Sequence, residues 1–159
     1  GIRIITYSCF TVRSSTDSLP KVEGRYVVKT PANDFKAGLA AGSQQIGIRS
    51  MACSAMVAEI LGNSGYDFVY IDMEHAPQDP MGMYHQLQAL GCAGTPAMIK
   101  LAINDPVAVQ RLLDMGAINY VVPMIQNAKQ AKEAVKLAKY PPLGTRGAPG
   151  IIRASRDGL

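Results

Sequence analysis

The sequence predicts an α/β protein in which strands and helices alternate, as in part of a (β/α)8 barrel. Two observations predict this class. From Asn33 onward, short apolar stretches alternate with helical stretches that begin at a polar cap and end near a glycine. In addition, residues 68–75 run from four apolar or aromatic residues directly into two acids and a histidine. This pattern is typical of a buried parallel strand that delivers chemistry at its carboxyl end.

The expected elements follow one another at short intervals along the chain. Helices are expected over 34–41, from Ser50 or Ser54 to 61, and over 80–90, 106–115 and 127–139, with Asn127 and Gln130 at the spacing of a capping box. Strands are expected over 45–48, 66–72, 97–101 and 118–122. Strict alternation implies parallel strands with right-handed crossovers. No strand is followed by G-x-G-x-x-G or a P-loop, which favours a barrel over a nucleotide-binding sheet.

The chain divides into two regions. Residues 1–31 form an N-terminal extension, in which a short strand is expected over 25–29. The Ser, Thr and Arg content of residues 1–18 faintly resembles a transit peptide, and the favoured alternative is an upstream tail or a short strand over 3–7. Residues 32–159 hold about four βα units, whereas a complete barrel has eight strands in about 200–250 residues. We therefore expect the second region to be the N-terminal half of a larger barrel domain.

Composition excludes several classes of partner. The chain has 159 residues, 48% of them hydrophobic, and a net charge of +4 that is scattered rather than gathered in a basic stripe, so no nucleic-acid partner is expected. No apolar run approaches the ~20 residues of a membrane span. The three cysteines, Cys9, Cys53 and Cys92, make no CxxC pair. We expect a reduced compartment, the cytoplasm with the mitochondrion as alternative, and Cys53 and Cys92 as small core residues.

The candidate catalytic residues follow the strand that ends at Asp72. His75 is the first candidate for a general base, because histidine exchanges protons near neutral pH. Asp72 and Glu74 are alternate residues, so both carboxylates could point the same way and bind metal, hold metal-bound water or orient His75. Helix capping and loop hydrogen bonding are the structural alternatives for the two acids.

Two basic residues lie where they could meet an anionic substrate. Lys100 ends an apolar strand, where it could form a Schiff base, pair with an anion or simply be solvated. Arg146 lies in a Gly-rich loop and could clamp a carboxylate or phosphate, or be an ordinary surface arginine. Spacing alone leaves these alternatives open.

The chain from Asn33 to about Asp157 resembles the HpcH/HpaI family of class II pyruvate aldolases. The resemblance is carried by several runs in family order, of which Asp-x-Glu-His-Ala-Pro is the most specific. They include Ile71-Asp-Met-Glu-His-Ala-Pro, Asn104-Asp-Pro, Leu112-Leu-Asp-Met-Gly and Val122-Pro-Met-Ile-Gln-Asn. The resemblance implies an oligomeric metal-dependent barrel enzyme that cleaves 4-hydroxy-2-oxo acids into pyruvate and an aldehyde.

The resemblance also implies roles for individual residues. His75 becomes the general base, Asp114 the partner that raises its basicity, and Arg146 and Gln126 substrate-side candidates. Lys100 stands where the family has an arginine, so the charge is kept but the bidentate fork is lost. The family's cofactor is a divalent metal such as Mg²⁺, Mn²⁺ or Co²⁺. Its ligands lie on later strands, so no metal ligand is expected among these residues.

Two further expectations concern assembly and alternatives. Asp114 is expected at a helix C-terminus, near the end of the barrel opposite His75, so we expect the two to meet across a subunit interface of a homo-oligomer. The alternatives are a truncated, non-catalytic chain that acts at most as an interaction module, and a decarboxylase or other lyase on the same barrel.

Overall fold

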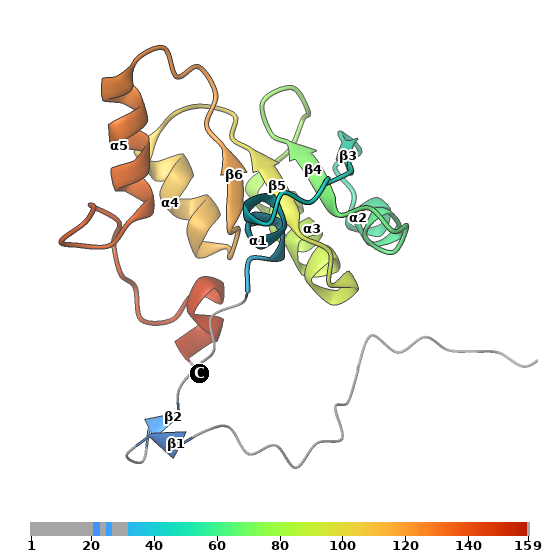
Figure 1. Cartoon of the computed structure of the whole chain (residues 1–159), viewed down its shortest axis with the longest axis horizontal. Coiled ribbons are helices and arrows are strands. Elements are labelled where there is room, and N and C mark those ends of the chain that lie inside the picture. Colours follow the sequence, from blue (N-terminus) through green and yellow to red (C-terminus); the bar gives the residue numbers. More distant parts are fainter. Residues whose placement is uncertain (1–20, 23–24, 27–31, 159) are drawn as a thin grey trace, which may run out of the picture.

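A parallel four-stranded sheet forms the centre of the computed structural model, which describes residues 21–22, 25–26 and 32–158. The strand order is β3-β4-β5-β6, so each strand pairs with the next one in sequence (Figure 1). The strands are β3 (Gly47–Ser50), β4 (Phe68–Asp72), β5 (Ala97–Lys100) and β6 (Asn119–Val121). Parallel neighbours in sequence order are the arrangement of consecutive barrel strands, which confirms the predicted partial barrel.

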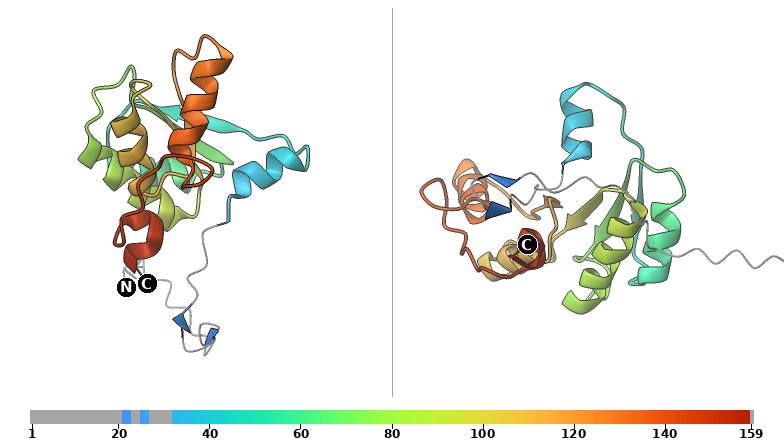
Figure 2. Two further views of the ribbon diagram at one scale, coloured as in Figure 1. Left: turned by 90° about the vertical axis from the view of Figure 1, so that its left-hand side faces the viewer. Right: turned by 90° about the horizontal axis from the view of Figure 1, so that it is seen from below.

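Helices cover both faces of the sheet unequally. One face is covered by α2, α3 and α4, and α1 lies on the other (Figure 2, right). The helices are α1 (Asp34–Ala40), α2 (Ala55–Gly62), α3 (Pro80–Ala93), α4 (Pro106–Asp114) and α5 (Ala128–Ala138), followed by the 3₁₀ helix η1 (Arg153–Gly158). None of the helices in the described part of the chain has the length and apolar character that crossing a bilayer requires.

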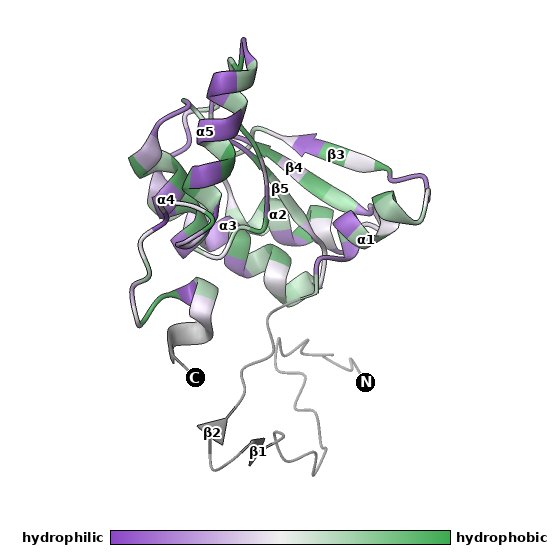
Figure 3. Cartoon of the chain, turned by 60° about the vertical axis from the view of Figure 1, so that its left-hand side comes forward, coloured by the Kyte–Doolittle hydropathy of each residue, from purple (hydrophilic) through white to green (hydrophobic). Residues whose placement is uncertain are grey.

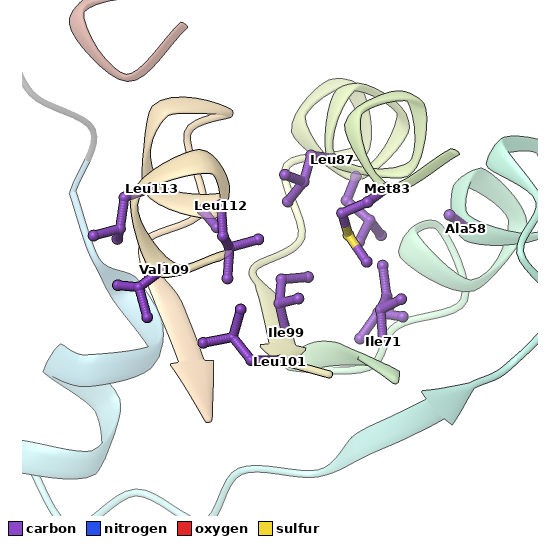
Figure 4. Packing of buried hydrophobic residues seen from close by; sticks show 12 residues of the cluster. Ala58, Ile71, Met83, Leu87, Ile99, Leu101, Val109, Leu112 and Leu113 are labelled. Carbon is purple, nitrogen blue, oxygen red and sulfur yellow. The ribbon is translucent and has the colours of Figure 1, made fainter. Parts of the chain in front are cut away.

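The core lies between the sheet and the three covering helices. Side chains alternate across each strand, so Val69 and Ile71 of β4 and Ile99 of β5 all point to the helical face. They meet apolar residues of the helices, including Met83 and Leu112 (Figure 4). Removing one such side chain from water contributes about 1.5–3 kcal/mol. This packing fixes which residues must emerge on the opposite face.

That opposite face carries the polar residues of the strands. In the strand register Arg49 is paired with Tyr70, and Asp72 with Lys100, so all four project to the side away from the core. At the amino ends of the strands this face is covered by α1. There the ring centroids of Phe35 and Phe68 lie 4.9 Å apart. The carboxyl ends of the strands are left for the candidate site.

Helix termini follow the predicted capping residues closely. Ser54, Asp79, Asp105 and Asn127 are the N-caps of α2, α3, α4 and α5. The capping box is only half formed. Asn127 Oδ1 accepts from the Gln130 N–H at 2.9 Å, whereas Gln130 Oε1 accepts from the Gln126 N–H instead of that of the cap residue. The fifth helix is polar over much of its length (Figure 3).

Strand β3 begins two residues later than the sequence predicts, at Gly47 instead of Gln45. Sheet pairing decides this boundary, because Gly47 is in register with Phe68. A Cβ at residue 47 would lie 2.3 Å from the Phe68 ring, so this position favours glycine. The Ile46 N–H is turned to Asp67 Oδ2 at 2.7 Å.

The expected burial of two cysteines was wrong. Cys53 is half-buried and Cys92 is exposed, and both are free thiols. Cys92 lies on α3, whose core-facing positions are taken by Met83, Leu87 and Leu90 at spacings of four and three. Cys9 lies outside the described residues, as does most of the N-terminal extension. Of the strand expected over residues 25–29, Arg25–Tyr26 forms β2, which pairs with β1 (Lys21–Val22) in an antiparallel ribbon.

Candidate active site

Asp72 organises the loop that follows β4. Its side chain is 0% exposed. Its Oδ1 accepts from the backbone N–H groups of Glu74 at 2.8 Å and His75 at 3.0 Å, and its Oδ2 pairs with the guanidinium of Arg49. These contacts bend the chain sharply after the strand and bring Glu74 and His75 back over its end.

The same contacts set the ionisation of Asp72. Burial acts to raise the pKa of this carboxyl, but the hydrogen bonds from the His75 and Glu74 backbone and from Arg49 together hold it below its ordinary value. Asp72 is therefore an anion at neutral pH. This buried carboxylate has both oxygens occupied and supports the loop. Its expected part on the substrate side stays a prediction.

Glu74 joins two other candidates. Its Oε2 lies 3.2 Å from His75 Nε2 and also forms an ion pair with Lys100. The hydrogen bond that Lys100 donates to Glu74 raises the pKa of Lys100, so this side chain is a cation at neutral pH. A Schiff base requires a neutral amine, and this environment favours the charged one. The side chain of His75 is 59% exposed, against 21% for Glu74 and 22% for Lys100.

Three adjacent strands thus contribute to one cluster. Arg49 comes from β3, Asp72 from β4 and Lys100 from β5, and the β4–α3 loop adds Glu74 and His75. All lie at the carboxyl ends of parallel strands, where barrel enzymes hold their chemistry. The sequence places Arg49-Ser50 among the segments expected at this face, because they follow a predicted strand, but it assigns Arg49 no role. Its pairing with Asp72 depends on the register of two strands.

Asp114 and Arg146 form a second cluster instead of joining the first. Asp114 is the last residue of α4, and Arg146 Nη2 donates to its Oδ1 at 3.0 Å. The Arg146 side chain is 10% exposed and its guanidinium carbon lies 4.8 Å from the centroid of the Tyr140 ring. Among the described residues, Asp114 and Arg146 contact each other, and Arg146 also contacts Tyr140. Neither forms a hydrogen bond or ion pair with His75 within this part of the chain.

Gln126 lies in the loop after β6, at the carboxyl edge of the sheet, and is exposed. Its described hydrogen bond uses its backbone N–H, which donates to Gln130. The edge is the one that carries His75, but the described residues include no hydrogen bond between Gln126 and that cluster. Its substrate-side role stays a prediction.

The residues present do not make a metal site on their own. Within the described part of the chain, no group of three or more His, Cys, Asp and Glu side chains could hold a metal ion. Asp72 has both oxygens engaged, and Glu74 is shared between a lysine and a histidine. A divalent ion at this edge requires ligands from other residues.

Sequence comparison places the chain among known proteins. Residues 45–154 match the family described as HpcH/HpaI aldolase/citrate lyase. The chain is 46% identical over 116 residues to the 2-dehydro-3,6-dideoxy-6-sulfogluconate aldolase of Pseudomonas putida, covering 73% of this chain and 46% of that protein. It is 43% identical over 125 residues to a 4-hydroxy-2-oxo-heptane-1,7-dioate aldolase of Escherichia coli, covering 78% and 48%.

The fold agrees with these relatives. The structure superimposes on an HpcH/HpaI aldolase/citrate lyase family protein from Burkholderia cenocepacia with a TM-score of 0.76 and 35% sequence identity, covering 80% of this chain and 52% of the other. The chain therefore spans about half the length of the curated relatives it matches.

Proposed function

Because the chain belongs to the HpcH/HpaI aldolase/citrate lyase family, we propose that it supplies the proton-transfer half of a carbon–carbon lyase site. In this proposal residues 32–159 are the N-terminal half of a (β/α)8 barrel domain and residues 1–31 precede it. The coverage of about half of each relative supports this division. The two edge strands, β3 and β6, each pair on one side only among the described strands, so each can accept a further barrel strand.

The proposed reaction is cleavage of a 4-hydroxy-2-oxo acid to pyruvate and an aldehyde. His75 takes the proton of the C4 hydroxyl, the C3–C4 bond breaks, and its electron pair moves into the enolate of pyruvate, which then takes a proton at C3. The aldehyde carries C4 away. The exposed imidazole at a strand end, oriented by a loop tied to Asp72, is the observation that supports this role.

The charged neighbours have distinct parts in the proposal. Glu74 bridges His75 and Lys100, so it can stabilise the imidazolium while the proton is held there. Lys100 offers a positive charge to the anionic 2-oxo acid. A lysine does this as a single point charge, without the two parallel hydrogen bonds of an arginine.

The proposal includes the family's divalent metal and its assembly. Mg²⁺, Mn²⁺ or Co²⁺ would stabilise negative charge on the oxygens of the 2-oxo acid, and we expect its ligands outside the described residues. We also expect a homo-oligomer in which His75 of one subunit meets Asp114 of another. Three cysteines without a CxxC pair favour the cytoplasm, and small-molecule 2-oxo acids and aldehydes are the expected partners.

The first test replaces His75 by asparagine in the full-length protein. We expect the rate of pyruvate release from 4-hydroxy-2-oxo acids, with Mg²⁺ or Mn²⁺ added, to fall by about 10²- to 10⁴-fold, because the general base is lost. His85→Asn is the matched control, since His85 is an exposed residue of α3 outside the cluster, and its rate should stay at the parental value.

Equal rates for both variants and the parent would contradict the assignment of His75. A parent that releases no pyruvate from any such acid would contradict the lyase itself. Activity on a citrate-like substrate alone would favour the second candidate, a related lyase, which the citrate lyase part of the family description makes specific.

A further inference from the structure

Arg146 sits on a loop that is folded against the end of α5. The backbone N–H of Thr145 donates to Lys136 O at 3.0 Å, and that of Arg146 to Lys139 O at 3.0 Å. Gly144 lies so close that a side chain there would approach the Lys136 and Lys139 carbonyl oxygens to 2.3 and 2.2 Å. The loop therefore presents Arg146 in a defined position.

The guanidinium is committed to the interior. Its side chain is 10% exposed, it donates to Asp114, and it stacks on Tyr140. Its Nε is buried and has no hydrogen-bond partner within the described residues. Burial of an arginine costs free energy, which a carboxylate and an aromatic face offset here. Breaking the contact with Asp114 to bind a substrate would therefore be unfavourable.

Among the described residues, only one of the two carboxylate oxygens of Asp114 has a hydrogen-bond partner. In the described part of the chain its hydrogen bond with Arg146 engages Oδ1, and Oδ2 accepts none. Asp114 also lines a hollow of about 390 Å³ between α3, α4 and η1, together with Tyr84 and Arg111. A carboxylate held at one oxygen and open at the other can still accept a hydrogen bond from an incoming group.

We propose that Arg146 is a positioning residue that holds Oδ1 of Asp114 so that Oδ2 receives the imidazole of His75 from a second subunit. This inference rests on the proposed function, in which Asp114 and His75 meet across the interface. It replaces the substrate-clamp role expected for Arg146 from the sequence. The carboxylate then needs no reorganisation when the imidazole arrives, which is the advantage of an oriented partner.

Arg153 provides a matched control in the same segment. It too lies over a tyrosine, with its guanidinium carbon 5.8 Å from the centroid of the Tyr84 ring. It donates, however, to backbone carbonyls, those of Met115 at 2.8 Å and Leu87 at 3.1 Å. It lines the same hollow as Asp114 but donates no hydrogen bond to that carboxylate, so its loss removes packing and hydrogen bonds of a comparable kind and leaves the Arg146–Asp114 contact in place.

The test is a double-mutant cycle in the full-length oligomer. Arg146→Met, Asp114→Asn and the double variant are compared with the parent and with Arg153→Met, by kcat and KM for pyruvate release. We expect Arg146→Met to lower kcat about 10- to 100-fold, as loss of an orienting contact does, with KM changed less than about twofold. The double variant should be no slower than Asp114→Asn, because both act through one carboxylate. Arg153→Met, which changes the same hollow without removing a hydrogen bond to Asp114, should lower kcat less than Arg146→Met does.

Other results would overturn the inference. If Arg146→Met raised KM and kept the parental kcat, Arg146 would be a substrate ligand. If the loss of kcat in the double variant were the product of the two single losses, Arg146 and Asp114 would act independently. If Arg146→Met does not assemble, Arg146→Lys replaces it in the cycle, and we expect a smaller loss of kcat for this variant. A parent without lyase activity removes the proposed function itself, whereas an active parent with an unimpaired Arg146→Met variant removes only this inference.

Discussion

At the scale of single residues, Asp72 is the feature on which the candidate site depends. A carboxylate with 0% exposure is costly unless it is fully hydrogen-bonded, and this one accepts from two backbone N–H groups and one guanidinium. The result is a rigid turn that carries Glu74 and His75. The backbone of His75 is therefore held by a residue that has no contact with solvent.

Replacing Asp72 tests this account through stability. Asp72→Asn keeps an oxygen for the two backbone donors but loses the charge beside Arg49, so we expect the free energy of unfolding at pH 7 to fall by about 1–3 kcal/mol. Asp72→Ala should cost more, because the donors lose their acceptor. Urea unfolding of the full-length protein measures both, with Asp34→Asn, an exposed residue of α1, as the near-neutral control.

The stability of Asp72→Asn relative to the parent should also depend on pH. The folded-state pKa of Asp72 is lowered, so its stabilisation is complete above the ordinary aspartate pKa of about 3.9 and is lost as pH falls through the folded value. The difference in unfolding free energy between parent and Asp72→Asn should be constant from about pH 5 to 7 and shrink below about pH 4. A difference that grew on acidification would contradict the ionised, hydrogen-bonded state.

At the scale of elements, the caps decide where helices begin. In α4, Asp105 Oδ1 accepts from the Val107 and Ala108 N–H groups, each at 2.9 Å, and Pro106 occupies the first helical position. Such signals act within one turn, so sequence alone locates them. The start of β3 was misplaced because its register depends on Phe68, a residue of the next strand.

The contribution of the α4 cap to stability can be measured by substituting Asp105. Asp105→Ala should lower the free energy of unfolding by about 1 kcal/mol, since two helical N–H groups lose their acceptor, whereas Asp105→Asn should change it little because an Asn oxygen can cap equally well. Thermal or urea unfolding of the two variants distinguishes these outcomes. Equal losses in both would show that the charge, and not the cap, carries the effect.

At the scale of the whole molecule, the described residues form a partial barrel sheet and two separate charged clusters. His75 and Asp114 belong to separate clusters within the described residues. Their proposed meeting is between subunits, which predicts complementation. Full-length His75→Asn and Asp114→Asn proteins, each impaired, should regain activity when unfolded together and reassembled as mixed oligomers.

The expected recovery is quantitative. If each site takes its histidine from one subunit and its aspartate from another, random mixing in equal amounts restores about one site in four. Pyruvate release per site, compared with each variant reassembled alone, measures it. No recovery in mixed oligomers whose composition has been verified would contradict the intersubunit pairing.

The sequence alone determined the order of strands and helices, most helix starts and the loop that carries His75, because these depend on short-range periodicity, caps and a local motif. Only the tertiary structure decided the charge pairs. Arg49 with Asp72, Glu74 with Lys100 and Arg146 with Asp114 join different elements. In each pair, the strand register or the docking of a loop brings the two side chains within hydrogen-bond reach. Register and docking depend on residues far apart in the sequence, so local patterns do not reveal them. For the same reason, spacing alone left Arg146 open between a loop clamp and an ordinary surface arginine, and the fold makes it a buried partner of Asp114.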